Sequence, residues 1–286
     1  MPDAITPAER HAQQVEDWNG PIGAQWVANE ARTERALAPV LRALLDIALV
    51  QPGETILDIG CGAGGTTQAL AEAVGPAGRV VGLDVSETIL AAARARLAGF
   101  AHVELVRADA AEWVKPGPQA DLLFSRFGVM FFGDPPAAFA NLRRSLAPDG
   151  RLAFACWRPV ADNPWVGVPA AAAATVVPMP PPPGPEEPGQ FAFGDADRVR
   201  RILAAAGFAA PNVQAWDFTM RYPADDLRAT AEAMAGGGQV GRMLRDQPDS
   251  VRPAVVDAIA AALPAHVRDD RVVLGASVWL VTARPK

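Results

Sequence analysis

ILDIGCGAGGTT, residues 56–67, is the stretch of this sequence that decides the fold. Its first residues are apolar and predict a buried strand. Its four glycines permit a sharp turn with positive φ and a closer approach to the backbone than a Cβ allows. A helix that begins directly after this turn offers free N–H groups and a partial positive charge. The stretch therefore predicts a strand, a ligand-binding turn and a helix.

Strands and helices alternate around this turn. A helical pattern over 34–49 precedes it, and Ser86 and Pro135 are placed to begin two later helices. Short apolar strands are predicted at 79–84, 103–107, 121–125 and 151–157. Strands that alternate with helices indicate a parallel sheet covered on both faces. The fold class is therefore α/β, with a Rossmann-like sheet flanked by helices.

The rest of the chain is organised differently. A proline-rich stretch is followed by a helical pattern over 195–206, an alternating strand over 212–222 and a last strand over 272–282. We expect four parts: an N-terminal helical lid (1–33), a cofactor-binding core (34–158), a Pro-rich substrate loop (159–194) and a C-terminal part of the core sheet (195–286) with a helical insertion (223–268).

The glycine pattern alone leaves two cofactors open. Gly60, Gly62 and Gly65 also satisfy the G-x-G-x-x-G fingerprint of dinucleotide-binding proteins. Asp58, two residues before the first glycine, would repel a pyrophosphate but suits an ammonium or a sulfonium group. Asp58 therefore favours S-adenosylmethionine over NAD.

Two further carboxylates follow successive strands. Asp84 ends the second strand and is placed to accept both ribose hydroxyls of either cofactor. Asp109 follows the third strand and can accept from the amino group of adenine. Because the carboxyl ends of parallel strands meet at one edge of a sheet, we expect these acids and Asp58 to surround one nucleoside.

Composition excludes several classes of partner. The net charge is −6 and no run of Lys or Arg occurs, so neither nucleic acid nor an anionic membrane is expected as a partner. The two cysteines, Cys61 and Cys156, form no metal-binding pattern, and no metal is expected. The N-terminus lacks the apolar core of a signal peptide, and Val166–Val177 is too short to span a membrane. We expect a soluble, cytoplasmic protein; a homodimer stays open.

These segments resemble the class I S-adenosylmethionine-dependent methyltransferases, particularly the small-molecule branch with the ubiquinone/menaquinone methyltransferase-like (type 11) proteins. ILDIGCGAGGTT, VVGLD, RADAAEW and LAPDGRLAFACW are similar to the family's successive motifs. The resemblance implies a seven-stranded sheet whose last strand, 272–282, is antiparallel and lies beside 212–222. It also implies the cofactor S-adenosylmethionine and the cofactor-binding residues Asp58, Gly60, Cys61, Gly62, Gly64, Thr66, Asp84, Val85, Asp109, Ala110 and Ser125, with Trp18 and Trp26 of the lid.

The acceptor is expected beyond the ends of strands four and five. The resemblance implies transfer of a methyl group by in-line displacement to a small, apolar or aromatic molecule. The candidate substrate residues are Arg126, Met130, Trp157, Asn163 and Trp165. Alignment of acceptor and methyl group supplies much of the catalysis in such a reaction, so a strong base is not required, and no catalytic base is assigned.

Two alternatives stay open at this point. A NAD-type oxidoreductase has the same sheet, although Asp58 and the antiparallel last strand oppose it. A non-catalytic module would keep the cofactor pocket and use its surface for a protein partner.

Overall fold

A computed structural model of the chain describes residues 15–117, 119–180, 184, 187–245 and 247–286. The chain divides into two compact units. The first comprises the described parts of Met1–Trp157, Glu186–Ala215 and Val278–Lys286. The second comprises the described parts of Arg158–Pro185 and Trp216–Ser277. The division does not test the four parts expected from the sequence, which stay predictions.

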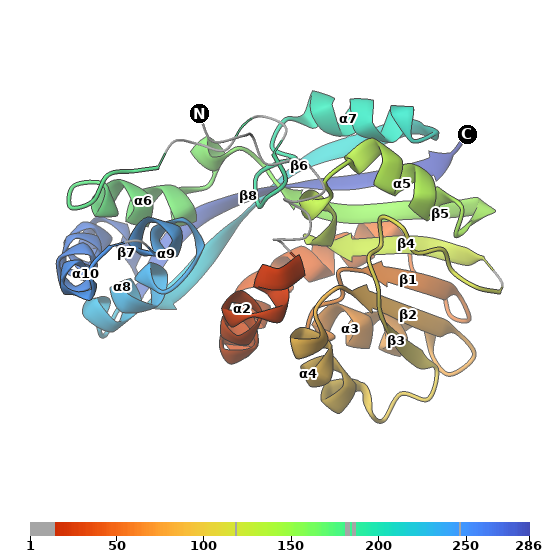
Figure 1. Cartoon of the computed structure of the whole chain (residues 1–286), viewed down its shortest axis with the longest axis horizontal. Coiled ribbons are helices and arrows are strands. Elements are labelled where there is room, and N and C mark those ends of the chain that lie inside the picture. The colour runs from red at the N-terminus through yellow and green to blue at the C-terminus, as the bar shows by residue number, and fades with distance from the viewer. Residues whose placement is uncertain (1–14, 118, 181–183, 185–186, 246) are drawn as a thin grey trace. The chain divides into compact units, whose positions relative to one another are not determined.

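A mixed sheet runs through the fold (Figure 1). Its strands lie in the order β3-β2-β1-β4-β5-β8-β6, and the two-residue strand β7 pairs with β8 outside this path. The bounds are β1 Thr55–Ile59, β2 Arg79–Asp84, β3 Val103–Arg107, β4 Ala120–Arg126, β5 Leu146–Trp157, β6 Phe208–Pro223, β7 Val267–Arg268 and β8 Arg271–Pro285.

Strands β1 to β5 are parallel, and β8 is antiparallel to β5, with Phe154 opposite Val281. The chain order reverses between β1 and β4, which is the switch point where ligands bind in open α/β sheets. The predicted fold class, including the antiparallel last strand between β5 and β6, is confirmed.

Helices cover the two faces of the sheet in the first unit. Helix α2 contacts α4, which contacts α3, while α5 packs against α7 in a separate layer (Figure 1). The bounds are α2 Pro21–Ala48, α3 Gly65–Val74, α4 Glu87–Leu97, α5 Pro135–Arg143 and α7 Ala196–Ala205. The helix expected over 34–49 thus begins earlier, at Pro21, which occupies its first turn.

The core of the first unit is apolar and aromatic. Phe139, Phe154, Phe193 and Phe208 are all fully buried, and the rings of Phe139 and Phe154 lie 5.6 Å apart. Edge-to-face and tilted ring pairs of this kind contribute beyond the burial of their area. This core fixes β5 and the helices behind it.

The second unit contains a small cluster of helices beside parts of β6 and β8 and the short β7. Its helices are α6 Pro164–Ala173, α8 Leu227–Ala235, α9 Gly238–Leu244 and α10 Arg252–Ala262, packed around buried residues such as Val255 and Ile259. The described residues of 223–268 include α8, α9 and α10, and those of 159–194 include α6; the parts expected there from the sequence stay predictions. An alanine-rich run in 159–194 has high helix propensity and forms α6, with Pro164 in its first turn. In the described part of the chain, no helix is long and apolar enough to cross a membrane.

Candidate functional site

The glycine turn between β1 and α3 is open at its centre. Gly60, Gly62 and Gly64 have φ of 67°, 56° and 84°, which other residues rarely adopt. A Cβ on Gly60 would lie 2.7 Å from the Cα of Gly128, so these two backbones require close approach. A Cβ on Gly62 would meet only the Trp26 indole nitrogen, at 3.8 Å. The turn therefore keeps a space at Gly62 that a larger side chain would enter.

Asp58 lies beneath this turn and is fully buried. Its Oδ2 accepts a hydrogen bond of 2.7 Å from the Thr67 hydroxyl, while its Oδ1 has no partner among the described residues. Burial raises the pKa of Asp58 from 3.8 to about 7, against the lowering effects of Thr67 and of the Arg126 charge. A buried carboxylate oxygen without a donor fits a cationic ligand group.

The raised pKa predicts a pH-dependent affinity for the demethylated cofactor, S-adenosylhomocysteine. Below pH 7 Asp58 carries a proton that a cationic ligand group must displace, so affinity falls about tenfold between pH 8 and pH 6. Calorimetric titration at both pH values measures the affinity. The Asp58→Asn variant is the control, because its side chain cannot bind or release this proton. Equal affinities at both pH values in the wild type would contradict the assignment.

Protonation of Asp58 weakens ligand binding but stabilises the unliganded fold. Because the folded pKa lies above the unfolded value, protonated Asp58 stabilises the unliganded fold at acidic pH. That contribution is lost as pH rises from about 4 towards 7.

Asp84 at the end of β2 is held by two backbone amides. Its Oδ2 accepts from Gly62 N at 3.0 Å and its Oδ1 from Ser86 N at 2.9 Å. Burial raises its pKa, and these hydrogen bonds oppose that rise. The carboxylate is thereby fixed between the glycine turn and α4, with further lone pairs available to a ligand.

A pocket of about 390 Å³ opens beside the end of β3. It is lined by Val15, Val85, Arg107, Ala108 and Asp109. The Asp109 carboxylate also accepts from Ala111 N at 2.8 Å, which fixes its direction. Two residues that the sequence assigned to adenine, Val85 and Asp109, therefore line one cavity; the third, Ala110, is buried.

The N-terminal segment is tied to the loop after β2. Asn19 donates to Val85 O at 3.2 Å and accepts from Glu87 N at 3.0 Å, and Ser86 Oγ donates to Trp18 O at 2.6 Å. The Trp18 ring packs edge to face on Trp26, with centroids 6.0 Å apart. Both tryptophans thus belong to a segment that borders the glycine turn and the loop after Asp84.

The end of β4 is joined to the glycine turn by Ser125. This buried hydroxyl donates to Ile59 O at 2.7 Å and accepts from Gly128 N at 3.1 Å. Ser125 thus lies within β4 and not after it. Its hydroxyl is hydrogen-bonded to two backbone groups of the protein.

Replacing Ser125 by Ala is expected to lower the free energy of unfolding by about 1–3 kcal/mol, since it leaves a buried carbonyl and a backbone N–H without their partner. Urea denaturation measures the change. Asp134→Ala loses only the exposed N-cap of α5, a hydrogen bond from Ala137 N, and is expected to cost only ~1 kcal/mol. A Ser125→Ala loss below that of Asp134→Ala would contradict the structural role of Ser125.

Arg126 ends β4 and forms an ion pair with Glu34 of α2. The Arg126 side chain is 7% exposed, and its Nη1 has no partner among the described residues. The Glu34 carboxylate lies against Gly65, where a Cβ would stand 2.7 Å from it. The ion pair therefore borders the start of α3.

The other expected substrate residues are engaged by the protein itself. In the first unit, Met130 is buried and its sulfur contacts Trp157 N at 3.5 Å, while the Trp157 ring stacks on Phe127 at 4.5 Å. In the second unit, Asn163 is fully buried, its Oδ1 accepts from Trp165 Nε1 and Ser277 N, and its Nδ2 donates to backbone carbonyls. The amide of Asn163 is thus fully engaged by the protein, and its contact with a substrate stays a prediction.

Cys61 and Thr66 are also directed into the protein. Cys61 is buried against α4 residues such as Leu90 and Ala93, and its backbone N–H donates to Leu83 O at 2.9 Å. Thr66 is buried in the first turn of α3. Their contact with a cofactor stays a prediction.

The sequence interpretation missed three residues of this region. Thr67 was identifiable as the second threonine after the glycines, one turn into the helix. Glu34 and Arg107 gave no signal, because a charged residue on a helix or at the end of a strand is usually solvated. Among the described residues, no group of His, Cys, Asp and Glu side chains could hold a metal ion.

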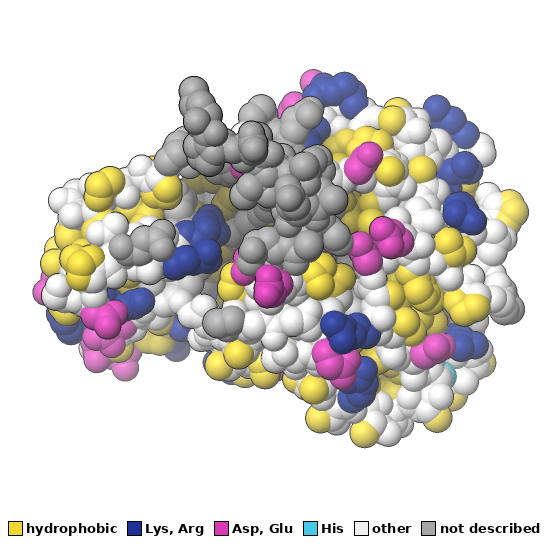
Figure 2. All heavy atoms as spheres, viewed as in Figure 1, with side chains coloured by type: hydrophobic (Ala, Val, Ile, Leu, Met, Phe, Trp, Pro, Cys, Tyr) yellow, Lys and Arg dark blue, Asp and Glu magenta, His cyan; other side chains and the backbone are white. Residues whose placement is uncertain are grey.

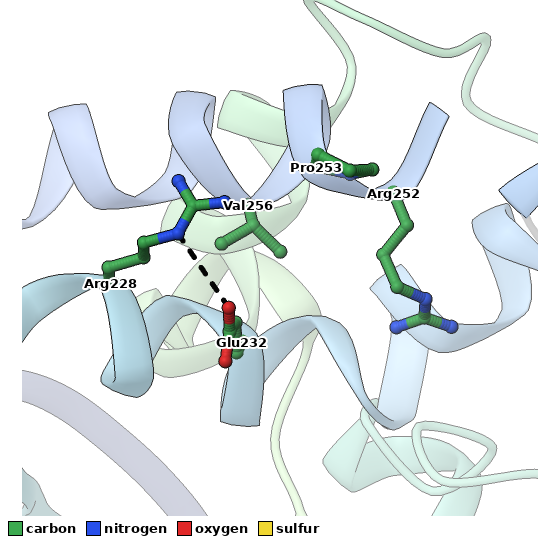
Figure 3. Close-up of a pocket in the computed structure, with 5 residues that line it drawn as sticks. All are labelled: Arg228, Glu232, Arg252, Pro253 and Val256. Carbon is green, nitrogen blue, oxygen red and sulfur yellow. Dashed lines mark ion pairs between the residues drawn. The ribbon is translucent and has the colours of Figure 1, made fainter. Parts of the chain in front are cut away.

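A second cavity, of about 240 Å³, lies in the second unit between α8 and α10. Figure 3 shows Arg228 and Glu232 on one wall and Arg252, Pro253 and Val256 on the other. Arg228 is paired with Glu232 at 3.7 Å and also with Asp257. Its charge is thus already compensated.

Comparisons with known proteins decide the family. A methyltransferase domain model matches residues 56–150. Nocamycin O-methyltransferase of Saccharothrix syringae is 39% identical over 116 residues, which is 40% of this chain and 41% of that protein. Trans-aconitate 2-methyltransferase of Variovorax paradoxus strain S110 is 30% identical over 78% of this chain and 80% of that protein. The chain belongs to the class I S-adenosylmethionine-dependent methyltransferases.

The structural comparison agrees with the fold of this class. A putative methyltransferase from Bacillus halodurans C-125 superposes with a TM-score of 0.54 at 20% identity, over 86% of this chain and 99% of that one. The predicted activity, methyl transfer from S-adenosylmethionine to a small molecule, is confirmed for this methyltransferase by its relatives. They do not support the oxidoreductase or the non-catalytic module.

Proposed function

We propose that this methyltransferase holds S-adenosylmethionine at the ends of β1, β2 and β3, with Asp58 at the methionine end, Asp84 at the ribose and Asp109 at the adenine. One observation carries the proposal: the three carboxylates, the open turn at Gly62 and the adjoining pocket all occur along one edge of the sheet. The unpartnered Oδ1 of Asp58 fits the cationic end of this cofactor.

The chain's own residues bind and orient the reactants. When bound, S-adenosylmethionine supplies a methyl group on a positively charged sulfur. The acceptor nucleophile displaces the sulfur from the methyl carbon, in line with the bond that breaks. The glycine turn allows the backbone to approach the cofactor, and Asp84, fixed by Gly62 N and Ser86 N, keeps the ribose in one orientation. Val85 packs beside the adenine, and Trp18 and Trp26 exclude water above the turn. Orientation of this kind is the main contribution a protein makes to such a transfer.

The acceptor is a small molecule that reaches the methyl group beside the end of β4. Its expected apolar or aromatic character is a prediction based on the aromatic residues near β4 and β5, although Met130 and Trp157 are packed in the core. By their names, one relative methylates trans-aconitate and another is an O-methyltransferase of nocamycin. Trans-aconitate is a small organic acid, so a compound of this class is the first acceptor to test.

Nucleic acid is not proposed as an acceptor. Figure 2 shows Lys and Arg side chains interspersed with Asp and Glu on this face, and the net charge is −6. Such a surface gives little long-range attraction to phosphates. A cytoplasmic location and a homodimer stay predictions.

Binding of the demethylated cofactor tests the proposed site. S-adenosylhomocysteine at 100 times its Kd is expected to stabilise the fold by about 2.7 kcal/mol, and NADH is expected to have no effect. Thermal denaturation with each compound measures both. Stabilisation by NADH alone would contradict the proposal.

A further inference from the structure

Arg126 carries a hydrogen-bond donor that the protein leaves unused. Its side chain is 7% exposed, and its Nη2 donates to Glu34, but its Nη1 has no acceptor among the described residues. A guanidinium cannot lose its proton, and a buried charged donor without an acceptor is unfavourable. The unused Nη1 therefore indicates an acceptor that arrives with a ligand.

The position of Arg126 is fixed next to the cofactor turn. Phe127, the following residue, has a φ of 71°, a strained value that turns the chain sharply at the end of β4. Gly128 then lies against Gly60, and the Glu34 carboxylate lies against Gly65. The guanidinium is thus anchored between the end of β4 and the start of α3.

Two unpartnered atoms of opposite charge occur in this region. Asp58 Oδ1 lacks a donor and Arg126 Nη1 lacks an acceptor, and the charge of Arg126 acts on the pKa of Asp58. An ammonium and a carboxylate would satisfy them. A phosphate dianion fits less well, because Glu34, Asp58 and Asp84 already place negative charge around this site.

We propose that Arg126, oriented by Glu34, binds a carboxylate group of a ligand in the cofactor site. This inference rests on the proposed function of that site. The carboxylate has two possible sources, the methionine part of the cofactor or an organic acid that serves as acceptor. In both cases Arg126 Nη1 donates to a carboxylate oxygen, and Glu34 prevents the guanidinium from turning away.

Two pairs of ligands that differ only in carboxylates separate these sources. The first pair is S-adenosylmethionine and its decarboxylated form. The second pair, added to protein saturated with S-adenosylhomocysteine, is trans-aconitate and its trimethyl ester. Calorimetric titration gives the affinity ratio within each pair for wild type, Arg126→Gln and Arg79→Gln. Arg79 is the control because it lies at the start of β2, the opposite edge of the sheet, and is exposed.

We expect the wild type and Arg79→Gln to prefer the carboxylate ligand at least tenfold in one pair, and Arg126→Gln to lose that preference. Loss in the first pair assigns the carboxylate to the cofactor, and loss in the second assigns it to the acceptor. No preference in the wild type, or a preference that survives in Arg126→Gln, would overturn the inference.

Folding and the proposed function are controlled separately. Arg126→Gln leaves the Glu34 carboxylate without its partner, so Arg126→Gln/Glu34→Gln serves as a second variant in which both charges are absent. It is expected to show the same loss. 5′-Methylthioadenosine, which has no amino-acid part, should bind all variants equally. If it fails to bind the wild type, the proposed nucleoside site is wrong; if it binds while the preferences do not depend on Arg126, only the carboxylate inference is wrong.

Discussion

Replacing Asp84 by Asn is expected to weaken the binding of adenosine about 100-fold. A carboxylate that accepts both ribose hydroxyls provides two charge-assisted hydrogen bonds, which together correspond to ~3 kcal/mol. An amide in its place would also direct its NH2 group at Gly62 N or Ser86 N, both of which are donors. Calorimetric titration with adenosine measures the loss.

The ribose contact can be isolated from a general disturbance of the loop. Wild-type protein is expected to prefer adenosine to 2′,3′-dideoxyadenosine strongly, and Asp84→Asn is expected to bind both with similar, low affinity. Asp121→Asn is the matched control, because Asp121 also accepts from a backbone amide, Thr55 N at 2.8 Å, but at the opposite edge of the sheet. An unchanged preference in Asp84→Asn would remove Asp84 from the ribose site.

Replacing Gly62 by Val is expected to weaken S-adenosylhomocysteine binding by at least about 100-fold, since the side chain would enter the space kept open at the turn. The positive φ of Gly62 adds a strain of about 1–2 kcal/mol that has nothing to do with the ligand.

Gly53→Val controls for that strain. Gly53 has a φ of 84°, and a Cβ there would meet nothing within 4 Å. Both variants are expected to lose similar unfolding free energy in urea, whereas only Gly62→Val loses affinity. If Gly53→Val weakens binding as much as Gly62→Val does, the loss of affinity results from lower stability, and the glycine turn at Gly62 is not a binding surface.

The sheet was predictable because its signals are local. The strand, glycine turn and helix over 56–67 follow from periodicity and from glycine's freedom at positive φ, and the last strand over 272–282 is a mostly apolar run. The continuity of α2 from Pro21 into the helix expected over 34–49, and helix α6, were missed, because proline and alanine-rich stretches also occur in loops. Tertiary packing, which a single sequence does not display, selects the helix there.

The residues of the candidate site also fall into those that the sequence could predict and those that it could not. Asp58, Asp84 and Asp109 lie within, at or just after the carboxyl ends of the successive strands β1, β2 and β3, so topology alone brings them to one edge. Asn163 and Arg126 looked alike in the sequence, as polar residues near apolar ones. Their difference depends on partners far away in the chain: the amide of Asn163 meets Ser277, and Arg126 meets Glu34 while keeping one donor unused.

A crystal structure with S-adenosylhomocysteine tests the central assignment most directly. We expect both ribose hydroxyls at about 2.6–3.2 Å from the Asp84 carboxylate and the adenine in the pocket beside Asp109, with the homocysteine end over Gly62. A nucleoside bound away from Asp84, or a turn at Gly62 covered by Trp26 with the ligand elsewhere, would contradict the account.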